Sequence, residues 1–178
     1  MATHVMIDLE TMGVQPGAAI VALGAVAFSA EGGILDTFYN TIDLASAIHA
    51  GGQIDASTVV WWMAQGDEAR KELTKKSPPL QQVLQEFAIW LGGKSPVAGI
   101  WGNGAGFDNV ILRQTYRRAK LKEPWHFAMD RCFRTMAAVF PDAKRVKPAL
   151  AHNALEDARA QALTLIEIMY GDKMKGLQ

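Results

Sequence analysis

Three segments in the first quarter of the chain have the hydrophobic pattern of β-strands. Residues 4–10 alternate into an apolar run that ends in two carboxylates, residues 19–28 are small or β-branched, and residues 34–42 alternate again. Turn residues separate the first two segments, and Glu31-Gly32-Gly33 supplies a tight reversal between the second and the third. This succession predicts a three-stranded antiparallel meander.

After the meander, apolar residues recur at helical spacing. Asp55 is a candidate N-cap for a helix that carries Trp61 and Trp62, and residues 67–73 form a second helical stretch. A longer helix is predicted over residues 77–91, with prolines in its first turn and a glycine pair after its end.

The second half of the chain predicts alternating strands and helices. Residues 97–101 form a short buried strand, residues 102–106 a glycine-rich loop, and residues 107–119 a helix with a basic outer face. Residues 125–129 are expected to form another strand, and Asp130 to cap the helix that follows it.

That helix is expected to run to about Phe140, before a polar loop over residues 141–148 and a last helix that begins near His152. The whole pattern predicts an α/β fold with a mixed five-stranded sheet, in which two parallel strands join the meander and helices flank the sheet. We expect one domain over residues 1–178, with a core from about residue 4 to residue 170.

Composition narrows the class of protein. The chain has 178 residues, of which 49% are hydrophobic and 20% charged, which excludes an intrinsically disordered chain. No apolar run reaches the length of a membrane span and no signal-like segment is present, so we expect a cytoplasmic protein without a membrane partner. The single cysteine, Cys132, excludes an internal disulfide framework and a multi-cysteine zinc site.

Charge gives no general sign of a nucleic-acid partner. Eighteen basic and eighteen acidic residues give a formal net charge of zero. A polyanion would therefore have to be bound locally.

Two acidic residues end the first predicted strand on one face. Asp8 and Glu10 are two positions apart, so their side chains point the same way. Their mutual repulsion would be relieved by a cation, for which a divalent metal is the natural candidate. The alternative is a pair of solvated acids at a strand end, and an isolated Asp-x-Glu does not decide between the two.

Two further segments carry candidate chemistry. Asp108 follows a glycine-rich stretch at the start of a helix, where it could cap the helix or meet a ligand that approaches the backbone closely. His152 and Asp157 lie at the start of the last helix, with the histidine on the entering loop and the aspartate on the first turns. A capping or surface histidine is the alternative for His152 taken alone.

Together these segments resemble a known family. Asp8-Leu-Glu10-Thr-Met-Gly13, the Phe107-Asp108 pair and His152-x-x-x-x-Asp157-Ala are similar in order and spacing to the three motifs of the DEDDh branch of DnaQ-like 3′→5′ exonucleases, which have a ribonuclease H-like fold. Within that superfamily, the chain most resembles small phage, prophage and bacterial exonucleases, including the mycobacterial exoribonuclease type. It departs from many relatives at Met12, where they have threonine, and in the spacing between Asn103 and Asp108.

The resemblance implies a metal-dependent 3′→5′ exonuclease that acts on single-stranded DNA or RNA 3′ ends. Two divalent ions, Mg²⁺ or Mn²⁺, would be held by Asp8, Glu10, Asp108 and Asp157, with Asp8 between them. His152 would be the general base, because a neutral imidazole is available near neutral pH. The product would be a nucleoside 5′-monophosphate.

Contacts to the terminal nucleotide are also implied by the resemblance. Leu9, Thr11, Met12, Trp61, Asn103 and Phe107 are the candidate substrate-binding residues, although Leu9 points into the core if its strand is regular. Trp61 could offer a platform for base stacking. A track for the phosphate backbone, or an ordinary solvated helix face, could be formed by Arg113, Arg117, Arg118, Lys120 and Lys122. The loop before His152 carries Lys144, Arg145 and Lys147, which could meet the phosphate backbone as that loop closes. A homodimer is possible.

Other functions stay open at this point. A ribonuclease H-like endonuclease or a phosphodiesterase for short oligonucleotides would use the same acidic residues. A non-enzymatic nucleic-acid-binding module is disfavoured because all five catalytic positions are filled. A Rossmann-like nucleotide binder has little support, because the glycine-rich stretch comes mid-chain and lacks the last glycine of that fingerprint.

Overall fold

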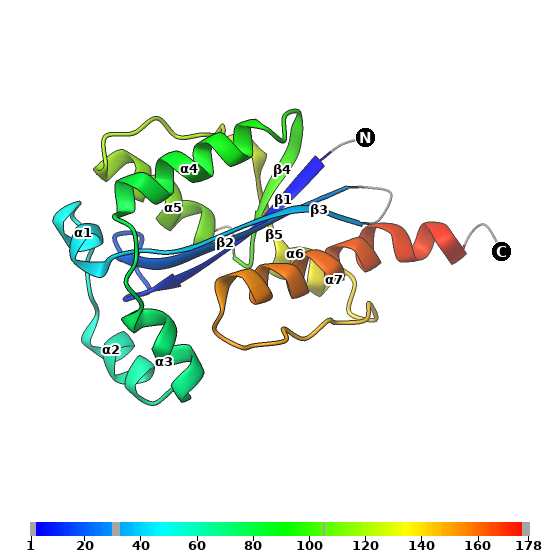
Figure 1. Ribbon diagram of the computed structural model, residues 1–178. Coiled ribbons are helices and arrows are strands. Elements are labelled where there is room, and N and C mark those ends of the chain that lie inside the picture. Colours follow the sequence, from blue (N-terminus) through cyan, green and yellow to red (C-terminus); the bar gives the residue numbers. More distant parts are fainter. Residues whose placement is uncertain (1–2, 30–32, 105, 176–178) are drawn as a thin grey trace.

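A computed structural model describes residues 3–29, 33–104 and 106–175 of the chain. Five strands form one mixed sheet in the order β3-β2-β1-β4-β5 (Figure 1). The strands are β1 (Thr3–Thr11), β2 (Ile20–Ser29), β3 (Gly33–Thr41), β4 (Val97–Gly102) and β5 (Asp130–Cys132). Strands β1 to β3 are antiparallel, and β4 and β5 extend the sheet in parallel from β1. The predicted meander and five-stranded sheet are therefore confirmed, while residues 31 and 32 of the predicted reversal lie outside the described residues.

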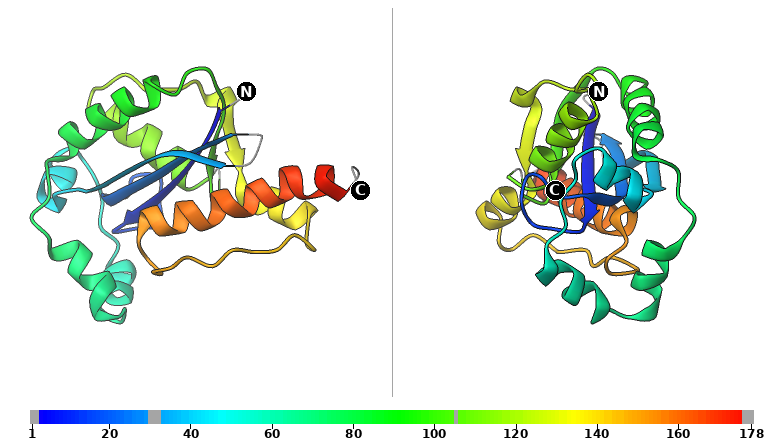
Figure 2. Two further views of the ribbon diagram at one scale, coloured as in Figure 1. Left: turned by 45° about the vertical axis from the view of Figure 1, so that its right-hand side comes forward. Right: turned by 90° about the vertical axis from the view of Figure 1, so that its left-hand side faces the viewer.

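Helices cover both faces of this sheet. They are α1 (Leu44–His49), α2 (Ala56–Met63), α3 (Asp67–Thr74), α4 (Leu80–Gly92), α5 (Asp108–Arg118), the short 3₁₀ helix η1 (Phe127–Met129), α6 (Phe133–Val139) and α7 (Ala154–Lys175). Helices α4 and α5 lie on one face and α6 and α7 on the other, while α2 and α3 extend beyond one end of the sheet (Figures 1 and 2). In the described part of the chain, no helix is both long and apolar enough to cross a membrane.

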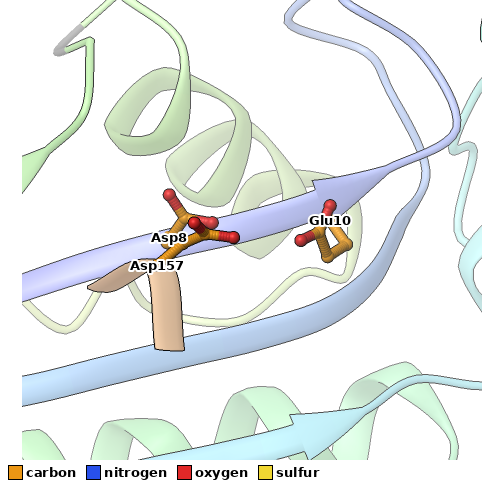
Figure 3. Close-up of side chains that lie close together, drawn as sticks. All are labelled: Asp8, Glu10 and Asp157. Carbon is orange, nitrogen blue, oxygen red and sulfur yellow. The ribbon is translucent and has the colours of Figure 1, made fainter. Parts of the chain in front are cut away.

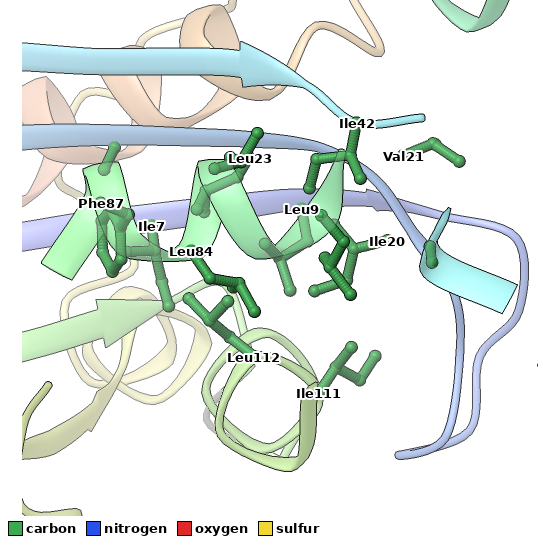
Figure 4. Packing of buried hydrophobic residues seen from close by; sticks show 14 of the residues in the cluster. Ile7, Leu9, Ile20, Val21, Leu23, Ile42, Leu84, Phe87, Ile111 and Leu112 are labelled. Atoms are coloured by element: carbon green, nitrogen blue, oxygen red, sulfur yellow. The ribbon is translucent and has the colours of Figure 1, made fainter. Parts of the chain in front are cut away.

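Alternation along β1 divides its side chains between the two faces. Val5, Ile7 and Leu9 belong to the core cluster that includes apolar residues of α4 and α5 (Figure 4). Met6 belongs to the second cluster, with residues of α6 and α7. Because the strand is regular here, Asp8 must share the face of Met6 and point toward α7.

A glycine allows α7 to approach the sheet closely. Gly24 on β2 pairs with Asp8 on β1. A Cβ at Gly24 would stand 2.2 Å from the carbonyl carbon of Ala154 and 2.4 Å from the amide nitrogen of Leu155. Only a residue without a side chain leaves room for the first turn of α7, and this close approach brings Asp157 over β1.

The strand predicted over residues 125–129 is wrong. Residues Phe127–Met129 form the 3₁₀ helix, and the strand that pairs with β4 begins at Asp130. Asp130 is therefore not the N-cap of the helix that follows, because Cys132 is the N-cap of α6. The Asp130 carboxylate instead accepts hydrogen bonds from Trp125 Nε1 at 2.7 Å and Asn109 Nδ2 at 3.1 Å.

Two other features differ from the sequence expectation. Helix α1 was not predicted, since its six residues are too few to show a helical period, and Asp43 caps it through a bond from the Ser46 amide. Asp55 is the N-cap of α2 but makes no side-chain cap bond. Its carboxylate accepts the Val14 amide at 3.0 Å instead, which ties α2 to the loop after β1.

Candidate active site

A cavity of about 630 Å³ opens beside the end of β1 and is bordered by α2, α5, α6 and α7. The sequence-predicted site residues meet there with one exception, Met12, whose side chain is 8% exposed and packs in the core. The predicted residues that line the cavity are Asp8, Leu9, Glu10, Thr11, Trp61, Asn103, Phe107, Asp108, His152 and Asp157.

Three carboxylates converge inside the cavity. Each of Asp8, Glu10 and Asp157 offers an oxygen that lies within 4.8 Å of the others. Figure 3 shows Asp8 and Glu10 on β1, with the Asp157 side chain extending from α7 toward Asp8. Alternation along β1 supplies two of these acids, and the approach permitted by Gly24 supplies the third.

A fourth carboxylate, that of Asp108 on α5, also lines the cavity. Asp108 is the first residue of α5, its side chain is 2% exposed, and it lines the same cavity outside the group of three. Its Oδ2 accepts the Gly104 amide at 3.3 Å. Burial raises the pKa of Asp108 to about 6, although backbone amides, that of Gly104 foremost, oppose this rise.

The other acids also resist ionisation in the metal-free site. Burial first, and then the charges of Asp108 and Glu10, raise the pKa of Asp8 well above its ordinary value. Burial and the charges of Asp157 and Asp108 raise the pKa of Glu10 to about 8. Burial also raises the pKa of Asp157. None of these four carboxylates takes part in an ion pair with a described residue. A cation bound among them would therefore offset both the cost of burying their charges and the repulsion between them.

The loop that enters α7 presents His152. Asn153 caps the helix, with its Oδ1 accepting the amides of Leu155 and Glu156 at 3.2 Å each. His152 has a φ of 62°, in the left-handed region that few residues other than glycine adopt. The predicted arrangement is confirmed: the histidine lies on the entering loop and Asp157 on the first turns of the helix.

Two tryptophans of α2 form the wall beside His152. The ring of Trp61 meets the imidazole edge to face, with centroids 4.9 Å apart, and that of Trp62 lies 6.3 Å away. Trp62 is buried and its Nε1 donates to the backbone oxygen of Thr11 at 3.0 Å, whereas Trp61 is 43% exposed. Both residues line the cavity. Through these contacts, α2 is joined both to β1 and to His152.

Four polar residues in the cavity were not predicted: Ser57 and Thr58 of α2, Arg134 of α6 and Gln161 of α7. Gln161 lies four residues after Asp157 on α7, and its Nε2 donates to Asp8 Oδ1 at 2.9 Å. The i, i+4 spacing from Asp157 is the signal that could have found it. Arg134 of α6 also lines the cavity, and no local motif marks it.

Half of the predicted cations have structural partners. Arg113 and Arg117 both pair with Glu123, at 2.6 Å and 2.5 Å. Arg118 donates to the carbonyl oxygens of two residues in the loop after β1, and Arg145 donates to the Ala137 carbonyl oxygen at 2.9 Å. These cations hold the fold together, and none of them lines the cavity.

Comparisons with solved structures match the chain to exonuclease I. The E. coli exonuclease I–ssDNA complex in its zinc-bound form is 15% identical, with a TM-score of 0.66 over 99% of this chain and 42% of that one. Exonuclease I from Methylocaldum szegediense is 13% identical, with a TM-score of 0.68 over 97% and 41%. The chain thus spans about two fifths of the length of these proteins. The match confirms the ribonuclease H-like fold.

Sequence comparison identifies the family. No curated protein matches the chain. A family model described as the 3′-5′ exoribonuclease Rv2179c-like domain matches residues 3–169, which include every acidic residue of the cavity and His152. The chain therefore belongs to the Rv2179c-like 3′-5′ exoribonuclease domain family.

Proposed function

We propose that this protein is a metal-dependent 3′→5′ exonuclease that hydrolyses phosphodiester bonds at single-stranded 3′ ends and releases nucleoside 5′-monophosphates. The observation that carries the proposal is the convergence of Asp8, Glu10 and Asp157 within 4.8 Å, in a cavity that also contains Asp108 and His152. Membership in a 3′-5′ exoribonuclease domain family supports the direction of cleavage. Structural neighbours in complex with ssDNA support a single-stranded substrate.

The acidic residues suit two divalent ions. All their donors are carboxylate oxygens, which favours Mg²⁺ or Mn²⁺. Asp8, Glu10 and Asp157 would hold the ion that binds the attacking water, and Asp8 and Asp108 would hold the ion beside the leaving 3′ oxygen. When bound, such a pair supplies an activated water and offsets the charge that develops on the attacking and leaving oxygens.

The protein's own side chains then orient the substrate and move the proton. His152 accepts a proton from the attacking water, and its position on the entering loop lets the imidazole reach over the acids. Trp61, Thr11, Asn103, Phe107 and the edge of Leu9 border the space for the terminal nucleotide. Trp61 can stack on any base, which suits an enzyme that accepts every sequence.

Cleavage of labelled strands tests this function. Single-stranded RNA and DNA oligonucleotides of one sequence, labelled at the 5′ end, are incubated with Mg²⁺, Mn²⁺ or chelator. We expect a ladder that shortens from the 3′ end only with metal. Replacing Asp157 by Asn should abolish the ladder, because the first ion loses a charged ligand.

A neighbouring acid provides the matched control. Glu156 is next to Asp157 on α7 but pairs with Arg159 and does not line the cavity. Glu156→Gln should therefore keep the ladder. Internal cuts would indicate an endonuclease instead. Cleavage of dinucleotides alone would indicate a phosphodiesterase for short oligonucleotides. Binding without cleavage would leave a nucleic-acid-binding module.

A homodimer is part of the same proposal. Val60 and Met63 expose 66% and 68% of their surface on α2, which leaves apolar area for contact between two copies. One chain has a mass of 19.4 kDa, and light scattering of the purified protein should give about twice that mass. The mass of a single chain would contradict this part of the proposal.

A further inference from the structure

We infer that Arg134 binds the phosphate on the 5′ side of the scissile bond, an inference that rests on the proposed exonuclease function. Arg134 lies in the first turn of α6, is exposed, and lines the cavity that contains the four carboxylates. No other lysine or arginine is among the residues that border this cavity in the described part of the chain.

The side chain of Arg134 is available for a ligand. Among the described residues it takes part in no ion pair and no side-chain hydrogen bond, although acidic residues line the same cavity. By contrast, Arg113 and Arg117 are paired with Glu123, and Arg118 and Arg145 are bonded to carbonyl oxygens. Arg134 therefore combines a position in the cavity with an unused guanidinium group.

A backbone hydrogen bond brings Arg134 next to the loop after β4. The Arg134 amide donates to the Asn103 oxygen at 3.0 Å, which anchors the start of α6 to the loop after β4. Arg134 Nη1 lies 3.9 Å from the place of a Cβ on Gly104, whose own amide donates to Asp108. The guanidinium and the Asp108 carboxylate thus flank the same glycine.

This placement selects one phosphate. In the proposed function, His152 and its tryptophan neighbours border the space for the terminal nucleotide and the attacking water. Arg134 lies with Asp108, the proposed ligand on the side of the leaving 3′ oxygen. The next phosphate of the retained strand would meet it there, and a guanidinium can bind a phosphate through two parallel hydrogen bonds.

Neutralising that one phosphate tests the contact. A single methylphosphonate is placed at the linkage next to the scissile bond on its 5′ side, in a 5′-labelled strand with the sugar that the wild type cleaves. In the wild type, we expect kcat/KM for removal of the last nucleotide to fall about 10-fold. Arg134→Gln should cause a similar fall on the unmodified strand, and the two changes together should cost little more than either alone.

Two controls separate this contact from general charge and from folding. Arg131→Gln removes the same charge three residues away, outside the cavity, where the guanidinium donates to two backbone carbonyl oxygens. It should leave the methylphosphonate effect unchanged. Arg134→Lys keeps the positive charge but loses the paired hydrogen bonds of the guanidinium. Its kcat/KM should therefore lie between those of Arg134→Gln and the wild type.

The outcomes distinguish this inference from the function on which it rests. No 3′ shortening by the wild type would remove the function itself. With an active wild type, the inference is overturned if Arg134→Gln retains wild-type kcat/KM. It is equally overturned if the methylphosphonate slows Arg134→Gln by the full factor seen in the wild type, because Arg134 would then act elsewhere.

Discussion

Gln161 Nε2 donates a hydrogen bond of 2.9 Å to Asp8 Oδ1 and so joins α7, which carries Asp157, to β1, which carries Asp8 and Glu10. The other amide atom, Gln161 Oε1, is buried and has no partner among the described residues. The bond engages one of the two carboxylate oxygens of Asp8. Gln161 is therefore a positioning residue for the proposed metal site.

Removing this bond should weaken metal binding. We expect Gln161→Ala to lower the affinity for Mn²⁺ by about 10-fold or more, because outer partners of metal ligands commonly contribute this much. Calorimetric titration of Mn²⁺ into the metal-free protein measures it without turnover. Gln82→Ala is the control, since the Gln82 side chain donates to Glu86 on α4 and does not line the cavity. An unchanged dissociation constant in Gln161→Ala would refute the role.

The contact between Trp61 and His152 predicts a second effect. With the ring centroids 4.9 Å apart, Trp61 restricts the imidazole on its loop. Trp61→Ala should lower kcat, while Trp61→Phe keeps an aromatic edge and should recover most of it. NMR supplies an independent reading, because loss of the neighbouring ring should move the His152 imidazole resonances. If Trp61→Ala raises KM and leaves kcat and these resonances unchanged, Trp61 contacts substrate and does not hold the histidine.

Gly24 controls the seating of α7. A methyl group there would overlap the Ala154–Leu155 peptide, so Gly24→Ala should destabilise the fold by about 1–3 kcal/mol and displace Asp157 and His152 from β1. Activity should fall more than the loss of folded protein explains. Gly33→Ala is the control, because a Cβ there meets no atom of the described residues within 4 Å. Chemical denaturation and kcat/KM, measured on both variants, check the prediction.

The acidic site predicts how stability depends on pH. The folded state holds protons that the unfolded chain has already released, because the pKa of Glu10 is raised to about 8 and that of Asp108 to about 6. The free energy of unfolding of the metal-free protein should therefore fall as pH rises from about 4.5, the ordinary range for these groups, to 8. Thermal melting with chelator should show this fall.

Metal and a single substitution provide the controls for the pH effect. Mn²⁺ should raise the melting temperature, and more so at pH 8 than at pH 5, because the ionised carboxylates bind it. Glu10→Gln should flatten the pH dependence without metal. If the melting temperature of the metal-free protein rises from pH 5 to pH 8, ionisation of the buried carboxylates does not destabilise the fold, and the prediction is wrong.

Much of the site could be predicted because its signals are local. The period of a strand places Asp8 and Glu10 on one face, and the start of a helix places His152 and Asp157 together. The five-stranded sheet follows from the same periodicities. Asp108 was predicted by its position after a glycine-rich loop, which the structure explains through the bond from Gly104.

The remaining features depend on contacts between distant segments. Asp130 was predicted as a helix cap, yet its partners Trp125, Asn109 and Arg113 come from separate parts of the chain. The last strand was predicted over residues 125–129 and lies at Asp130–Cys132. Because of this displacement, the contact between Arg134 and the loop after β4 was not predicted. Met12 lies within the acidic motif in sequence but its side chain packs in the core, although Thr11 and Gly13 on either side of it line the cavity.

The isotope content of the first product tests the central claim most directly. Wild-type protein with Mn²⁺ cleaves a single-stranded oligonucleotide in H₂¹⁸O, and mass spectrometry examines what is released first. Attack by water on the last phosphodiester predicts a nucleoside 5′-monophosphate that carries one ¹⁸O, with a 3′ hydroxyl on the shortened strand. A nucleoside 3′-phosphate, an internal fragment or a monophosphate without ¹⁸O would contradict a 3′→5′ hydrolytic exonuclease.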